Sequence, residues 1–206
     1  SMAVGMALDE GLFRLDDTVA RYFEDKLPEK PSDMLLRITV EDLLTMRVGF
    51  RDAMNGEFRT CVIEDVEGYY LSRPMKNMPG TVFDYDTGAT YMLAALIQRR
   101  TGVSVRDILQ DRLFDPLGIE NVTWPSCCCG VTIGGSGLML STSEMARFGQ
   151  FLLQRGIWNG EQIVPEKYIE RASKAHTHTP EEFMGYYGVN EGRFKDALVE
   201  YPDVPA

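Results

Sequence analysis

The first residues of the chain constrain its fold more than any other segment. Residues 2–8 are apolar on almost every side of a helix, and Asp9, Glu10 and Gly11 follow them. Gly11 fits the position just past a helix end, where the backbone turns left-handed. A helix that is apolar all round is normally buried at the centre of a domain. We therefore expect residues 2–8 to form a central helix covered by other elements. Nothing before this helix caps it, so we expect it to begin ahead of Ser1.

Caps and apolar spacing predict further helices. They cover residues 38–44, 87–101, 104–113 and 141–156, with a last helix that has Pro165 in its first turn. Thr39 with Asp42, and Ser141 with Glu144, each have the spacing of a capping box. Short extended stretches are expected at residues 81–85 and 131–133, and a turn at residues 158–161. The pattern is rich in helix and shows no internal repeat.

Composition excludes several classes of function. The chain has 206 residues, of which 44% are hydrophobic and 25% are charged, as in soluble globular proteins. Its net charge of −10 argues against nucleic acid as a partner, because binding to phosphates needs a cationic surface. The same charge disfavours docking to anionic lipid. No apolar run is long enough to span a bilayer, and the apolar start is too short for a signal peptide.

The cysteines and histidines give little support for a metal site. Cys127, Cys128 and Cys129 are consecutive, and Cys61 stands alone. Adjacent cysteines cannot all reach one tetrahedral metal ion, so we expect reduced thiols in a loop rather than a zinc site. Cysteine usage of this kind favours a reducing compartment such as the cytoplasm, although localisation stays unknown. His176 and His178 make only a weak pair of metal ligands, and we expect no metal and no cofactor.

Several stretches of the chain occur together in one order. Among them are Phe-Asp-Pro-Leu-Gly at residues 114–118 and Gly-Gly-Ser-Gly-Leu at residues 134–138. The others are residues 1–5, 9–11, 15–17, 38–45, 83–85, Tyr91, 146–150 and 158–160. In this order the chain resembles the serine β-lactamase-related family, which includes class C β-lactamases, D-alanyl-D-alanine carboxypeptidases and related esterases of the penicillin-binding-protein superfamily. The match extends over nearly the whole chain.

The resemblance implies an α+β fold of the β-lactamase/transpeptidase type. We expect this chain to hold mostly the helical region of that fold, with few short strands, because the strands of the family's sheet come from both chain ends. On this expectation residues 1–206 form a single β-lactamase-related domain, truncated at the N-terminus and at the C-terminus. Apolar helix surface left uncovered would then favour self-association.

The resemblance also implies an acyl-serine mechanism. The family places a Ser-x-x-Lys pair on one helical turn, and the tyrosine of a Tyr-x-Asn motif assists proton transfer. Tyr85-Asp86-Thr87 stands at the second position, which makes Tyr85 the expected general base and Thr87 an expected substrate contact. The threonine hydroxyl has one donor where the asparagine amide has two. Without the resemblance, Tyr85 would be interpreted as a half-buried aromatic residue at the start of a helix.

The other two motifs are absent in recognisable form. No serine of this chain has a lysine three residues later, and by resemblance that motif would end a few residues before Ser1. Ser136 lies in a Gly-Ser-Gly sequence, but Leu138 occupies the place of the second glycine of a nucleophile elbow. We therefore expect Ser136 to line the substrate pocket as part of a glycine-rich loop. Residues 185–188 resemble the approach to the third motif, yet Lys195 lacks the Thr-Gly that should follow it.

Two functions are compatible with this sequence. The first is a serine hydrolase acting on a β-lactam, a D-alanyl peptide or a small ester, whose nucleophile is not carried by this chain. The second is a non-catalytic relative that binds a ligand such as peptidoglycan, or that serves as an interaction domain. The expected partner is a small-molecule or peptidoglycan-like substrate in either case.

Overall fold

The computed structural model of the chain describes residues 1–54, 56, 62–120 and 122–177. Contacts divide the chain into two units, Ser1–Lys174 and Ala175–Ala206, and the elements below belong to the first. Its α-helices are α1 (Met2–Asp9), α2 (Val40–Leu44), α3 (Val66–Ser72), α4 (Thr87–Thr101), α5 (Val105–Leu109), α6 (Thr142–Leu153) and α7 (Glu166–Ala172). Short 3₁₀ turns cover Val19–Tyr22, Glu24–Lys26 and Leu35–Arg37. The described structure is thus helix-rich, as predicted.

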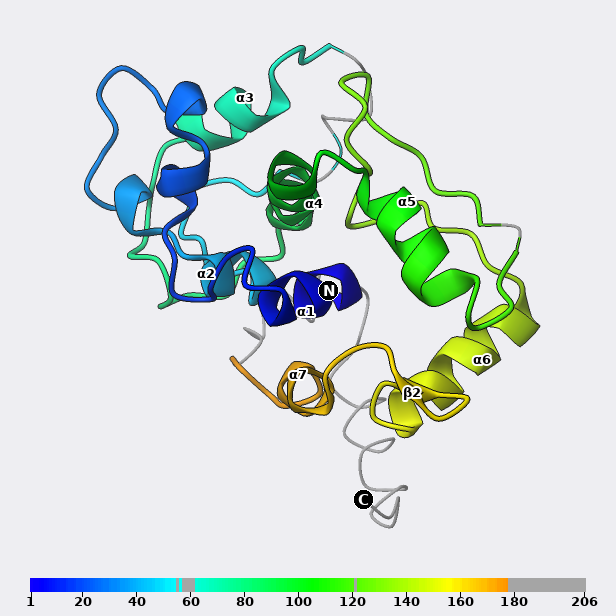
Figure 1. Cartoon of the computed structure of the whole chain (residues 1–206). Coiled ribbons are helices and arrows are strands. Elements are labelled where there is room, and N and C mark those ends of the chain that lie inside the picture. Colours follow the sequence, from blue (N-terminus) through cyan, green and yellow to red (C-terminus); the bar gives the residue numbers. More distant parts are fainter. Residues whose placement is uncertain (55, 57–61, 121, 178–206) are drawn as a thin grey trace, which may run out of the picture. The chain divides into compact units, whose positions relative to one another are not determined.

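Helices α1 and α4 form the centre of this unit (Figure 1). Helix α2 contacts α4, and α5 contacts both α1 and α4. In α1 the buried residues are Ala3, Val4, Gly5, Met6 and Ala7, which confirms the predicted central helix. Gly11 follows α1 with a φ of 67° and ends it as the sequence indicates. Burying α1 on all sides therefore requires the surrounding helices that the fold supplies.

Local capping signals locate most helix ends correctly. Thr39 with Asp42, and Ser141 with Glu144, form reciprocal capping boxes at the starts of α2 and α6. Helix α5 is shorter than predicted, because a wider π-type turn (Gln110–Phe114) replaces its second half. The last predicted helix begins at Glu166, so Pro165 is its N-cap rather than a residue of its first turn. It precedes α7 with a ψ of 131°, which is extended rather than helical.

Strands are few and short in the described residues, as expected. In the described residues the only paired strands are β1 (Ile157–Trp158) and β2 (Glu161–Gln162), an antiparallel hairpin around the predicted turn. Residues 82–85 have no regular secondary structure, and the strand-like residues 131–133 form no strand. A single antiparallel bridge joins Thr132 to Ser126, where the Cys127 amide donates to the Val131 carbonyl and the Ile133 amide donates to the Pro125 carbonyl. The sequence of these two stretches predicted extended backbone but did not indicate a pairing partner.

The cysteine loop corrects one prediction. Cys127 and Cys129 are joined by a disulfide, so the expectation of reduced thiols is wrong for this pair. A turn explains their approach: the Gly130 amide donates to the Cys127 carbonyl at 2.9 Å, and the two Cα atoms lie 5.3 Å apart. The Tyr91 hydroxyl contacts both sulfur atoms, at 3.5 and 3.2 Å. The preference for a reducing compartment loses its basis, and Cys61 lies outside the described residues.

Helix α7 covers the start of α1 through one aromatic ring. The hydroxyl of Tyr168 donates to the Ser1 carbonyl at 2.9 Å. Gly5 makes room for this ring, since a Cβ placed there would lie 2.5 Å from Cδ1 of Tyr168. Burial raises the pKa of the Tyr168 phenol to about 12 from its ordinary value of 10.0. The phenol is therefore held in its protonated form in the folded chain.

We expect the folded chain to lose stability above pH 10 through Tyr168. Because its folded-state pKa is raised, the contribution is complete below about pH 10 and disappears as the pH rises through about 12. Urea unfolding of the wild-type chain and of Tyr168→Phe, measured from pH 9 to 12, should show a shallower decline in the variant. Tyr70 and Tyr91, whose pKa values burial also raises, contribute equally to both proteins. Identical declines would contradict the prediction.

Candidate active site

The Tyr85-Asp86-Thr87 segment forms the beginning of the central helix α4. Tyr85 is partly buried, and Thr87 is the first residue of the helix with 5% of its surface exposed. Asp86 is the N-cap, and its carboxylate accepts a hydrogen bond from the Gly88 amide at 2.9 Å. A short carboxylate at this position satisfies a backbone donor that the first turn leaves free. The segment is thus fixed at the end of a rigid element.

Asp86 is also the centre of a buried polar network, which the sequence reasoning missed. The residue is 1% exposed. One oxygen, Oδ1, accepts from the amides of Gly88 and Met54, the latter at 3.1 Å. The other, Oδ2, accepts from the Tyr70 hydroxyl and from the Arg73 guanidinium, each at 3.0 Å. Its place as an N-cap could have been inferred from the sequence, but its distant partners could not.

Arg73 is the buried cation of this network. Its side chain is 9% exposed and lies over the rings of both Phe50 and Tyr70, at 4.3 Å from each ring centre. The Tyr70 ring is fully buried. Burial, and to a smaller extent the nearby Asp86 carboxylate, raises the pKa of its phenol well above the ordinary value of 10.0. Tyr70 consequently stays a hydrogen-bond donor to Asp86 at any physiological pH.

The glycine-rich loop at residues 134–137 lies against the same end of α4. A Cβ at Gly135 would come within 2.6 Å of Cγ2 of Thr87, and one at Gly134 within 2.5 Å of the Thr90 carbonyl oxygen. At Gly134 only glycine permits so close an approach of the loop to the backbone of α4. The structure therefore brings the loop that carries Ser136 next to Thr87, and Tyr85 lies two residues before Thr87.

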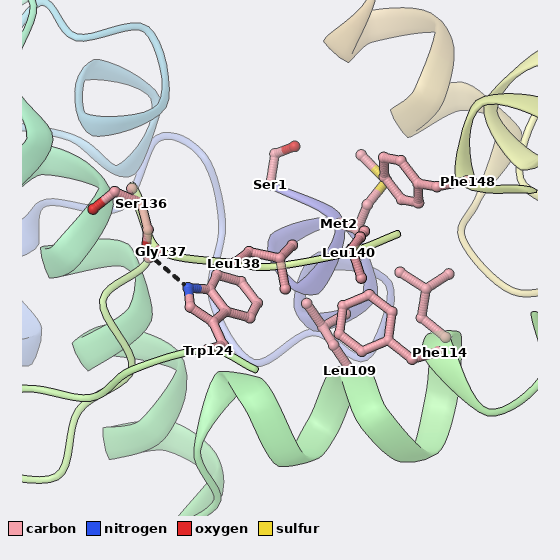
Figure 2. Close-up of a pocket in the computed structure, with 13 residues that line it drawn as sticks. Ser1, Met2, Leu109, Phe114, Trp124, Ser136, Gly137, Leu138, Leu140 and Phe148 are labelled. Atoms are coloured by element: carbon pink, nitrogen blue, oxygen red, sulfur yellow. Dashed lines mark hydrogen bonds between the residues drawn. The ribbon is translucent and has the colours of Figure 1, made fainter. Parts of the chain in front are cut away.

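An apolar pocket of about 330 Å³ adjoins this loop (Figure 2). Its wall includes residues 134–138 and, from the other elements, Met2, Leu109, Leu113, Phe114, Trp124, Leu140 and Phe148. The Ser136 carbonyl accepts a hydrogen bond from the Trp124 indole at 3.2 Å. In Figure 2 the Ser136 hydroxyl points away from the apolar side chains. Ser136 thus lines the pocket with its backbone rather than with its hydroxyl.

Alanine at Gly134 is expected to lower the free energy of unfolding by about 1–3 kcal/mol. The new methyl group would meet the Thr90 carbonyl, which belongs to the backbone of α4 and cannot rotate away. Gly149, inside α6 with nothing near its Cβ position, is the matched control. Gly149→Ala should raise stability by up to about 1 kcal/mol, because alanine favours helix. Urea unfolding of both variants checks the contrast, and equal shifts would contradict it.

Two further observations concern metals and membranes. Within the described ranges, no three His, Cys, Asp or Glu side chains are grouped so that they could hold a metal ion. None of the helices in that part of the chain combines the length and apolarity needed to cross a membrane. His178 and the stretch of residues 185–201, where the third motif was sought, lie outside the described residues.

Comparison with known proteins decides the family. A family model described as Beta-lactamase matches residues 1–189, which is most of the chain. The chain belongs to the beta-lactamase family. Among its relatives, an uncharacterized protein of Alkalihalophilus pseudofirmus is 24% identical over 187 residues, which are 82% of this chain and 49% of that protein. A D-aminopeptidase of Brucella anthropi is 32% identical over 116 residues, covering 52% of this chain and 21% of the relative.

Solved structures confirm the fold that is expected for this beta-lactamase family member. The octameric penicillin-binding protein homologue from Pyrococcus abyssi superimposes with a TM-score of 0.67 and 19% identity. The match covers 87% of this chain and 47% of that protein. The chain therefore has the β-lactamase/transpeptidase-like fold, and it spans about half the length, or less, of these three proteins.

Proposed function

We propose that the gene product containing these residues is a serine hydrolase that forms an acyl-enzyme on a β-lactam, a D-alanyl peptide or a small ester. One observation carries the proposal. In a beta-lactamase family member, the segment Tyr85-Asp86-Thr87 is anchored by a buried carboxylate beside a glycine-rich loop. The similarity to a D-aminopeptidase supports hydrolysis of an amide bond next to a D-residue.

In the proposed reaction, a serine hydroxyl attacks the substrate carbonyl carbon while a base removes its proton. Tyr85 is that base or its proton relay, and later returns the proton to the leaving group. The Thr87 hydroxyl offers a hydrogen bond to the substrate at the start of α4. The loop around Ser136 forms the adjoining wall. Water then hydrolyses the acyl-enzyme and regenerates the serine.

The decisive test begins with the coding sequence upstream of Ser1. The proposal expects Ser-x-x-Lys to be encoded there, and the gene product to be labelled by a fluorescent penicillin in a burst. Replacing that serine by alanine should abolish labelling. The 206-residue chain alone, which has no Ser-x-x-Lys, should neither be labelled nor hydrolyse nitrocefin or p-nitrophenyl acetate above background. Absence of the motif from the gene would contradict the hydrolase.

A non-catalytic, ligand-binding relative is the second candidate, and Thr87 favours it. The threonine stands where the family's motif has an asparagine, so one amide contact to a substrate is lost. A binding protein of this kind would retain peptidoglycan fragments without turnover. Calorimetry with such a fragment, followed by analysis of the fragment for cleavage, separates the two candidates. Binding without cleavage would establish the second.

Self-association is a further expectation for the 206-residue chain. Apolar side chains are exposed on and before α6: Met139 is 65% exposed, Met145 61% and Leu153 80%. Burial of this surface between copies would remove apolar area from water. We expect sedimentation velocity to show oligomers that dissociate in Leu153→Lys. A single sharp monomer boundary at high concentration would contradict the expectation.

A further inference from the structure

The backbone of Met54 joins residues 50–54 to the start of α4 by two hydrogen bonds, one to the Asp86 side chain and one to the Gly88 backbone. The Met54 amide donates to Oδ1 of Asp86 at 3.1 Å, and the Gly88 amide donates to the Met54 carbonyl at 2.9 Å. At the other end of the segment, the Arg51 amide donates to the Pro74 carbonyl at 2.9 Å. These bonds hold residues 50–54 against the helix start that follows Tyr85.

Arg73 joins the same two parts of the chain from the other side. One nitrogen of its guanidinium donates to the Asp52 carbonyl at 2.6 Å, and another donates to Oδ2 of Asp86 at 3.0 Å. Stacking on the rings of Phe50 and Tyr70 restricts the plane of the guanidinium. The planar guanidinium thus fixes the distance between residues 50–54 and the start of α4.

We propose that Arg73 and Asp86 are a positioning pair that holds Tyr85 and Thr87, together with residues 50–54, in one arrangement for the substrate. What Tyr85 does there rests on the proposed function. Neither member of the pair touches the substrate. Asp86 acts through its two neighbours in the chain, and Arg73 acts through Asp86.

A buried Arg–Asp pair contributes to the orientation of its neighbours more than to the stability of the fold. A buried ion pair is often no more stabilising than apolar side chains of the same size, because both charges lose their hydration. Its hydrogen bonds, however, fix distances and angles that apolar contacts leave adjustable. The four donors on Asp86 use both carboxylate oxygens and leave the side chain a single orientation. Tyr85 and Thr87 are the two residues that adjoin Asp86 in the chain, so its fixed orientation positions them.

The test uses Asp86→Asn and Arg73→Lys in the 206-residue chain and in the gene product that contains it. Labelling with 3-fluorotyrosine gives a fluorine NMR signal for Tyr85, identified by its loss in Tyr85→Phe. Hydrogen exchange reports on the amides of Met54 and Gly88. The matched control is Asp25→Asn, which removes an Arg–Asp pair at an exposed site. The Tyr168 signal, from α7, reports on folding.

Both variants should shift or broaden the Tyr85 signal and speed exchange of the two amides by at least about 10-fold. The Tyr168 signal should stay unchanged, and Asp25→Asn should resemble the wild type. In the gene product, kcat should fall by about 100-fold at similar KM, as for a misplacement of about 1 Å. An unchanged Tyr85 signal with unchanged amide exchange would overturn the positioning pair, even if kcat fell.

The two proposals fail separately in this design. The NMR and exchange measurements need no enzymatic activity. A gene product without acylation or hydrolysis would therefore refute the proposed function, while the Tyr85 signal and the amide exchange would still test the positioning pair. If Asp86→Asn fails to fold, Arg73→Lys tests the positioning pair instead. Lysine keeps the buried positive charge and loses only the second donor nitrogen of the guanidinium. A normal Tyr85 signal in a folded Arg73→Lys chain would then refute the pair.

Discussion

Tyr85→Phe in the gene product containing these residues is expected to lower kcat by about 10²–10⁴-fold, the usual contribution of one positioned acid–base group. The variant keeps the ring, so the packing at the start of α4 persists, and removes only the hydroxyl that would carry the proton. Substrate binding does not require this proton transfer, and KM should change little.

The measurement is the burst and steady-state hydrolysis of p-nitrophenyl acetate by the wild type and the variant. Tyr69→Phe serves as the control, because Tyr69 is 42% exposed on α3, outside the Tyr85-Asp86-Thr87 segment, and should retain full activity. Wild-type turnover by Tyr85→Phe would remove Tyr85 from the mechanism.

Asp86→Ala is expected to lower the free energy of unfolding by about 3–5 kcal/mol, the cost of breaking a buried ion pair by removing one partner. Alanine leaves the guanidinium of Arg73 at 9% exposure without its carboxylate. It also removes the acceptor of the Tyr70 hydroxyl, which is fully buried and stays protonated. Several donors therefore lose their partner in one substitution.

Equilibrium unfolding in urea measures this loss directly. Asp25→Ala provides the matched control, since Asp25 pairs with Arg99 at the surface and exposed pairs contribute only about 0–1 kcal/mol. A loss below about 1 kcal/mol for Asp86→Ala would show that the network relaxes around the missing carboxylate.

Interactions between near neighbours in the chain are the part of this fold that the sequence predicts well. The capping boxes at Thr39 and Ser141 need only residues within one helical turn, so the pattern contains every participant. The burial of α1 follows likewise from its own composition, because a helix without a polar face has to be covered. For Tyr85 and Thr87, position came from the family resemblance, and their roles stay predictions.

Interactions between distant segments were not predictable in the same way. Asp86 meets Arg73, Tyr70 and Met54 at separations of 13, 16 and 32 residues, and no local pattern indicates that these partners converge. The disulfide was missed for a related reason. Consecutive cysteines do not look like a disulfide framework, whereas the turn that joins Cys127 to Cys129 depends on backbone bonds to Gly130 and Val131.

The contact between Tyr168 and Ser1 has a kinetic consequence. The residues it joins are 167 positions apart, so the side of α1 that Gly5 leaves open receives its covering ring only after nearly the whole unit has been synthesised. At about 5–20 residues per second, translation needs roughly 8–33 s to supply it. During this interval the nascent chain displays an apolar helix with one side unclosed. Covering of this side of α1 therefore waits for α7, and we expect chaperones to bind α1 before α7 has been synthesised.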